Sequence, residues 1–221
     1  MSLLTTSVGR KVLMAVSGFF LLGFAVAHLI GNSTIFAGSG WINAYAEHLH
    51  NLGPFVWVFR AFMFFMLCLH ITFGVILTLE NWGANPGKYA VSKKLKVTFA
   101  SRTMIWTGLL LLAFIVGHLL QFTFRVTPDI VLSADELGRF DVYTMVVSSF
   151  RITAVAAVYI AAMVILFLHT SHGIQSFLQT LGLSNDQLLP RYTLAGKLIS
   201  TLFLVVYGAI PVLILTGILA K

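Results

Sequence analysis

Histidines within long apolar runs are the residues of this sequence whose type and spacing could do chemistry. His28, His70 and His118 each occupy one such run, and His169 and His172 share a fourth. An ionisable side chain inside hydrocarbon is costly unless it has a partner, so these residues are functional candidates. A neutral histidine ring offers a nitrogen lone pair to a metal. For any one of them alone, the alternative is a packed side chain bonded to a neighbouring carbonyl.

The apolar runs that carry these histidines are long enough to cross a bilayer. Of the 221 residues, 58% are hydrophobic and 10% are charged, which excludes an ordinary soluble domain. A span needs about 20 apolar residues. We therefore predict an all-α membrane protein, one domain over residues 1–221, with five transmembrane helices at residues 12–31, 55–79, 103–123, 142–178 and 198–220. The fourth run exceeds the bilayer thickness, so we expect it to tilt or project.

The basic residues indicate how these spans are oriented. Nine of the 14 lysines and arginines fall on the amino-terminal side of the predicted spans, and five of the seven acids fall on the other side. The positive-inside rule then places the N-terminus in the cytoplasm and the C-terminus outside. The net charge of +7 is explained by topology. We expect membrane lipids, and no nucleic acid, as partners.

Depth along the helices sorts the histidines into two levels. His28 follows the start of its span by 16 residues and His118 by 15, so both fall in the outer half of the bilayer. His70 and either His169 or His172 fall at the inner level. Haem iron takes two axial ligands on opposite faces of the ring, so two pairs from four helices match two haems. A zinc site would gather its ligands at one depth. The fifth span has no histidine, and we expect it to be peripheral to this haem-binding bundle.

Small and positively charged residues near the histidines suit the same cofactor. Four glycines would make room for the macrocycle: Gly31, Gly74, Gly117 and Gly173. The alternative explanation for them is close packing of the helices. Arg60 and Arg151 fall inside predicted spans, where haem propionates, a carboxylate or backbone carbonyls would be their partners. The inner haem could have the same kind of contact with four further residues: Arg10, Lys11, Ser17 and Arg102. For the three basic ones, the alternative is an anchor at the membrane interface. The single cysteine, Cys68, excludes covalent haem attachment through CxxCH and is expected in the core.

Several short motifs occur in a characteristic order. They are Gly-Arg-Lys at 9–11, His-Leu-Ile-Gly-Asn at 28–32, Asn-Ala-Tyr at 43–45, Ser-Arg-Thr-Met-Ile-Trp at 101–106, His-Gly at 172–173 and Gln-Thr-Leu-Gly at 179–182. With these motifs the chain resembles the cytochrome b membrane-anchor subunit of succinate dehydrogenase and fumarate reductase, in its single-chain, five-helix, two-haem form. The resemblance covers almost the whole chain.

The resemblance implies roles for the histidines. His28 and His118 would ligate a distal haem b, and His70 and His172 a proximal haem b. The family ligand directly precedes a glycine, which selects His172 over His169. His169 would then contact a propionate or support a ligand.

The resemblance also implies partners. Such subunits join a flavoprotein, which interconverts succinate and fumarate, and an iron-sulfur protein in the bacterial inner membrane. This chain would pass electrons to or from a quinone, expected to be menaquinone, and the whole complex could form a dimer. The loop with Lys88, Lys93, Lys94 and Lys96 could dock these proteins or anionic lipid headgroups.

Quinone chemistry needs a group that handles protons. Glu47, His48 and His50 precede the second span on the outer side and are the candidates, with a hydrated interfacial loop as the alternative. Two other functions stay open. One is the cytochrome b of another quinone-linked enzyme, such as a hydrogenase or formate dehydrogenase. The other is a transporter without haem, against which stands the absence of paired broken helices.

Overall fold

Five long helices dominate the computed structural model, which describes residues 4–84 and 98–219. Within these residues the chain is all-helical and has no strands, and five helices are long and apolar enough to cross a membrane. The prediction of five candidate membrane-spanning helices in an all-helical fold is therefore confirmed. The residues Lys88, Lys93, Lys94 and Lys96 lie outside the described part of the chain. The long helices are α1 (Ser7–Ser33), α3 (Pro54–Gly83), α5 (Met104–His118), α7 (Thr153–Thr180) and α8 (Leu189–Leu215).

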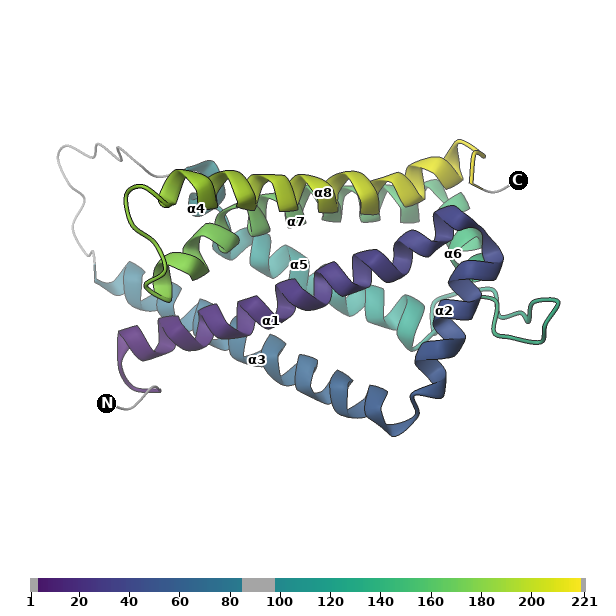
Figure 1. Ribbon diagram of the computed structural model, residues 1–221, viewed down its shortest axis with the longest axis horizontal. Coiled ribbons are helices and arrows are strands. Elements are labelled where there is room, and N and C mark those ends of the chain that lie inside the picture. The colour runs from purple at the N-terminus through teal and green to yellow at the C-terminus, as the bar shows by residue number, and fades with distance from the viewer. Residues whose placement is uncertain (1–3, 85–97, 220–221) are drawn as a thin grey trace.

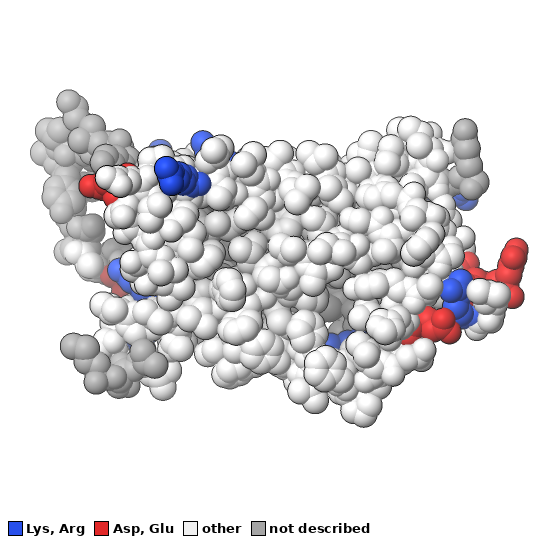
Figure 2. Space-filling view, in the orientation of Figure 1, with Lys and Arg blue, Asp and Glu red and all other residues white. Residues whose placement is uncertain are grey.

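The connections between these helices lie at two opposite ends of the bundle (Figure 1). We call the end where α1 begins the N-terminal end. At the other, the α2 end, α1 continues into η1 (Thr34–Ala37) and α2 (Ser39–Asn51). Figure 2 shows charged side chains gathered at the two ends of one face, with an almost entirely uncharged middle. Such a band suits a hydrocarbon layer, where a helix satisfies its own backbone hydrogen bonds.

Glycines permit the sharp turns on either side of α2. Gly38 has φ of 108° and Gly53 has φ of 55°, both in the region that residues with a Cβ rarely adopt. Pro54 then occupies the first turn of α3, where a missing N–H costs nothing. The chain can thus leave α1, cross the α2 end and re-enter the bundle.

The predicted fourth span is two helices. α6 (Val142–Arg151) ends where Ile152 adopts an extended conformation, with φ −79° and ψ 107°, and α7 begins at the next residue. The Asp141 side chain caps α6 by accepting from the Thr144 amide. The excess length is therefore a separate helix at the α2 end and not a tilt. Arg151, expected inside a span, lies exposed at the end of α6.

The fifth span begins earlier than predicted. α8 starts at Leu189, nine residues before position 198, and Pro190 lies in its first turn. A proline just ahead of an apolar run ordinarily predicts a break in the chain. The proline instead begins the helix, because its fixed φ suits the first helical turn.

Small residues allow α7 and α8 to pack closely, and the two helices lie side by side in Figure 1. Gly196 and Ser200 are buried, and the Ser200 and Thr170 hydroxyls are 2.8 Å apart. α8 also contacts α1, where the Tyr207 hydroxyl donates to the Ala25 carbonyl at 2.9 Å. The helix expected to be peripheral thus reaches the first span.

α3 presents much of its surface outward. Phe55, Trp57, Phe64 and Phe65 are exposed on it, as expected of side chains that face lipid. Cys68 is exposed as well, so the prediction of a core cysteine is wrong. At the N-terminal end, an ion pair between Arg10 of α1 and Glu80 joins the two helices.

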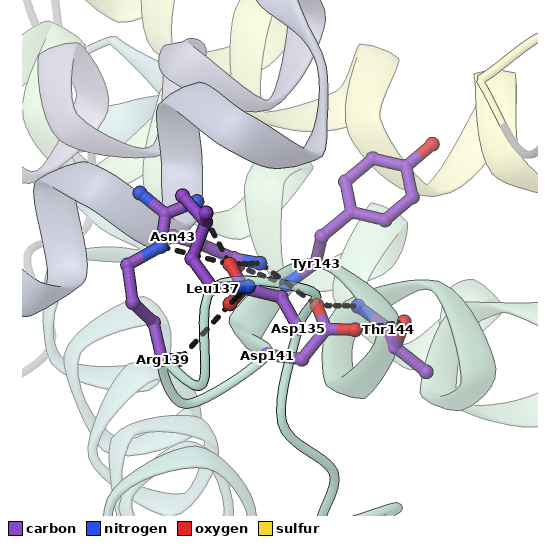
Figure 3. A network of polar contacts seen from close by, with 7 residues as sticks. All are labelled: Asn43, Asp135, Leu137, Arg139, Asp141, Tyr143 and Thr144. Atoms are coloured by element: carbon purple, nitrogen blue, oxygen red, sulfur yellow. Dashed lines mark hydrogen bonds and ion pairs between the residues drawn. The ribbon is translucent and has the colours of Figure 1, made fainter.

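A network of polar contacts fastens the connection between α5 and α6 to α2 (Figure 3). Asn43 is 1% exposed, and its amide donates to Asp135 at 3.2 Å and to Asp141 at 3.0 Å. Its side-chain oxygen accepts from the Tyr143 amide. Desolvation raises the pKa of the Asp135 carboxyl, but hydrogen bonds from Arg139, Asn43 and the Leu137 amide outweigh it, so this pKa lies below its ordinary value. The network therefore persists at neutral pH.

We expect Asn43→Leu to destabilise the α2 end. Leucine keeps the branched shape but leaves the Tyr143 amide without an acceptor and removes one hydrogen bond from each of the two carboxylates, at a cost of about 1–3 kcal/mol. Thermal unfolding in detergent, with limited proteolysis of residues 124–141, measures the loss. Asn51→Leu, at an exposed position of the same helix, is the control. Equal stability of the two variants would show that the network contributes little.

Candidate functional site

Two pairs of histidine rings face each other between the long helices. His28 of α1 and His118 of α5 have ring centroids 5.9 Å apart. His70 of α3 and His169 of α7 have centroids 6.3 Å apart. All four rings are half-buried. The structure thus joins α1 to α5 and α3 to α7 through one pair each, which we call the outer pair (His28, His118) and the inner pair (His70, His169).

His169, and not His172, is the fourth-span residue beside His70. The two are three positions apart, so they differ by about 60° around the helix and about 4.5 Å along it. The His169 ring also contacts α5, since its Nδ1 lies 3.1 Å from the Thr107 hydroxyl. The choice of His172, which followed from its glycine neighbour, is therefore revised on geometry.

Hydrogen bonds fix the ring orientation of three of these histidines. His70 Nδ1 lies 3.1 Å from the Met14 carbonyl, which can only accept, so this nitrogen carries the proton. Thr107 donates its hydroxyl proton to a backbone carbonyl of its own helix, so its oxygen accepts from His169 Nδ1. Tyr159 accepts from His118 Nδ1 in the same way, at 3.1 Å. A protonated Nδ1 leaves the Nε2 lone pair for a metal.

His28 has a different environment. Its Nε2 lies 3.2 Å from the Asn32 side-chain nitrogen, which also donates to the His28 carbonyl. Its ring stacks on Phe24, with centroids 5.4 Å apart, and the Tyr207 ring lies 6.1 Å away. For Nε2 of His28 to bind a metal, the contact with Asn32 must be given up.

The distances within the pairs leave room for one metal ion between the two rings of each pair. A metal ion held by both rings, whose centroids are 5.9 or 6.3 Å apart, would lie about 3 Å from each centroid. After the ring radius of about 1 Å, about 2 Å remains, the length of a metal–histidine bond. Haem needs only two protein ligands, because the porphyrin supplies the others. Across the described residues no group of three or more His, Cys, Asp or Glu side chains could hold a metal ion.

Glycines border the inner pair. A Cβ at Gly18 of α1 would lie 3.1 Å from His70 Cε1, and one at Gly108 of α5 would lie 3.3 Å from His169 Cε1. Both rings therefore fill space that a larger residue would occupy.

The four glycines predicted to make room for the macrocycle do not border a histidine ring of another helix. A Cβ at Gly31 would meet the Tyr45 ring at 2.5 Å, and one at Gly74 would have only Met14 Sδ nearby, at 4.0 Å. Gly117 and Gly173 have nothing within 4 Å of a Cβ. Gly31 thus serves the contact with α2, and Gly18 and Gly108 take the place beside the rings.

If a haem lies between the rings of the inner pair, we expect Gly18→Leu to remove it and to leave the outer pair unaffected. The new side chain would displace the His70 ring from its hydrogen bond to Met14. Haem content of the purified protein and the two haem potentials measure the effect. Gly23→Leu, on the same helix with nothing within 4 Å of its Cβ, is the control. Retention of the inner haem in Gly18→Leu would contradict the assignment.

Polar residues missed by sequence reasoning extend the outer pair toward the α2 end. Beyond His118 the helix widens into η2 (Leu119–Thr123), a π-helical turn in which the Phe124 amide bonds the Leu119 carbonyl at 2.8 Å. Such turns often mark functional sites. Gln121 within this turn is buried, accepts from the Tyr159 hydroxyl at 2.6 Å and donates to Asp129 at 2.5 Å. The sequence signal that could have found Gln121 is its polar side chain within an otherwise apolar segment.

Asp129 is the charged residue among the polar residues that follow His118. Partial burial raises the pKa of its carboxyl, but nearby side-chain donors, Gln121 among them, outweigh it and hold that pKa below its ordinary value. The Ser149 and Thr127 hydroxyls lie near this carboxylate without reaching good hydrogen-bond geometry with any described residue. Asp129 is therefore an anion at neutral pH.

The remaining predicted site residues lie away from the histidine rings. Arg60 is exposed, and its guanidinium lies 4.9 Å from the centre of the Trp57 ring. Arg102 is exposed at the end of α4 (Phe99–Arg102). The structure places on the exposed surface of α2 the three candidates for proton transfer: Glu47, His48 and His50. The buried Ser17 hydroxyl donates to carbonyls of its own helix.

Fold and site together define a multi-pass helical membrane protein with two histidine pairs between its spans. No family model matches the sequence, and no curated protein or solved structure matches it.

Proposed function

We propose that this chain is the dihaem cytochrome b membrane anchor of a succinate:quinone oxidoreductase. The observation that carries the haem proposal is that histidines from different helices lie in pairs, with ring-centroid distances of 5.9 and 6.3 Å. The identity of the enzyme complex is supported by the resemblance of the motifs described above. The outer pair, His28 and His118, would hold one haem b, and the inner pair, His70 and His169, the other.

A bound haem supplies one-electron chemistry, since its iron alternates between ferric and ferrous states. The chain's own residues orient the ligands. Met14, Thr107 and Tyr159 accept the Nδ1 protons and so leave each Nε2 lone pair available to a metal. Phe24 and Phe114, whose rings lie 5.4 and 5.9 Å from His28 and His118, exclude water from the outer pair.

The two pairs lie at different depths of the bundle and would carry electrons along it. We propose that the N-terminal end faces the cytoplasm of a bacterial inner membrane, as the basic residues indicate. A flavoprotein and an iron-sulfur protein would dock there and perform the dicarboxylate chemistry. A quinone, expected to be menaquinone, would react at the α2 end, where Glu47, His48 and His50 are exposed and could exchange protons with water.

The purified protein tests the proposal directly. We expect two b-type haems per chain, with a spectrum that changes on reduction by dithionite. If the soluble partners copurify with this chain and succinate then reduces the haem, the result would support the complex proposed. Haem reduced by hydrogen or formate instead would assign the chain to another quinone-linked enzyme. A protein without haem would refute both.

A further inference from the structure

A continuous chain of hydrogen bonds connects His118 to Asp129 at the α2 end. It runs from His118 Nδ1 to the Tyr159 oxygen (3.1 Å), from the Tyr159 hydroxyl to Gln121 Oε1 (2.6 Å) and from Gln121 Nε2 to Asp129 Oδ2 (2.5 Å). Chemistry fixes the direction of every step. Gln121 Oε1 can only accept, so Tyr159 donates to it, and the Tyr159 oxygen is left to accept from His118.

The end of this chain distinguishes it from the hydrogen bonds of the inner pair. His70 donates to the Met14 carbonyl and His169 to the Thr107 hydroxyl, both of which are neutral. The chain from His118 ends instead at a carboxylate. Successive hydrogen bonds polarise one another, so the negative charge of Asp129 is felt at the imidazole.

A proton wire is a poor description of this chain. The Gln121 amide stands in its middle, and an amide does not readily give up its N–H proton. The arrangement suits a fixed polarising contact, comparable to the carboxylate that often supports a metal-bound histidine.

We propose that Asp129, acting through Gln121 and Tyr159, holds His118 as the Nδ1–H tautomer and increases the electron density at its Nε2. The inference rests on the proposed function, because its effect appears in the haem of the outer pair. Greater electron density at Nε2 stabilises ferric over ferrous iron and lowers the reduction potential of that haem. Tyr159, Gln121 and Asp129 are thus positioning residues.

Redox titration of the purified, haem-loaded protein tests the proposal. Tyr159→Phe removes the hydroxyl that links His118 to Gln121, and we expect the ratio of reduced to oxidised outer haem at a fixed potential to rise about tenfold, a midpoint increase of about 59 mV. Asp129→Asn keeps an oxygen that can accept from Gln121 but removes the charge, so we expect a smaller shift in the same direction. The inner haem should keep its potential in both variants.

Two control variants match these changes. Tyr207→Phe removes a hydroxyl near the outer pair that donates to the Ala25 carbonyl and lies outside the chain. Glu136→Gln removes an exposed acid from the same connection. Neither should change the outer potential.

The outcomes separate this proposal from the proposed function. Wild-type protein without haem overturns both. Unchanged outer potentials in haem-loaded Tyr159→Phe and Asp129→Asn overturn the role of the chain and leave the cytochrome intact. If Tyr159→Phe fails to fold, Asp129→Asn decides alone, because its substitution lies outside the spans: an upward shift supports the proposal and an unchanged potential overturns it.

Discussion

We expect replacement of His169 by alanine to remove one of the two b-type haems proposed for the purified protein, whereas His172→Ala should retain both. This is the expected result because the His169 ring lies 6.3 Å from His70, donates to Thr107 and is bordered by Gly108. His172 is turned by about 60° from that direction. Haem quantification and the difference spectrum of reduced and oxidised protein measure the effect.

Three further variants complete this prediction. His28→Ala and His118→Ala should each remove the outer haem, and His70→Ala should remove the inner one. His172→Ala is the matched control, since it deletes the same side chain from the same helix one turn away. The reverse result, with haem lost only in His172→Ala, would restore the ligand that the motif alone suggested.

Gly196→Leu separates α7 from α8 and lowers the stability of the whole bundle. A Cβ at Gly196 would lie 2.9 Å from the Ser171 carbonyl oxygen and 3.5 Å from Ile174 Cβ. A backbone oxygen cannot turn aside as a side chain can, so α7 itself must move. Overpacking of this kind costs about 1–3 kcal/mol. We also expect weaker retention of the inner haem, because Ser171 is close to His169 on α7.

Thermal unfolding in detergent and elution volume on gel filtration measure this second effect. Gly208→Leu is the control, since a Cβ at Gly208 of the same helix meets nothing within 4 Å. A melting temperature of Gly196→Leu equal to that of Gly208→Leu would mean that the two helices adjust to the larger residue without loss.

Hydropathy predicts the spans because a bilayer imposes a length of about 20 apolar residues on every crossing helix. The same averaging conceals the break at Ile152, since the apolar residues of α6, among them Met145, Val146 and Phe150, run on into the more apolar span that follows. One residue in an extended conformation divides the two helices, and a window of many residues cannot detect it. The early start of α8 is hard to predict because a proline marks a chain break as readily as the first turn of a helix.

Depth along the helix predicts which levels the histidines occupy, but helix rotation decides which rings meet. A rise of about 1.5 Å per residue sufficed to group His28 with His118. The choice between His169 and His172 depended on which face of α7 points toward α3. Tyr159 and Gln121 were visible as polar residues in apolar segments, yet their partnership depends on the π-helical turn after His118, which has no clear sequence pattern.

The pairing of alternate spans has a consequence for synthesis of the protein. The outer pair joins the first span to the third, and the inner pair joins the second to the fourth, so the two connections interleave along the chain. A nascent chain that has emerged through α5 contains both outer histidines but only His70 of the inner pair. The outer pair can therefore assemble first, while the inner pair must wait for α7 to enter the membrane.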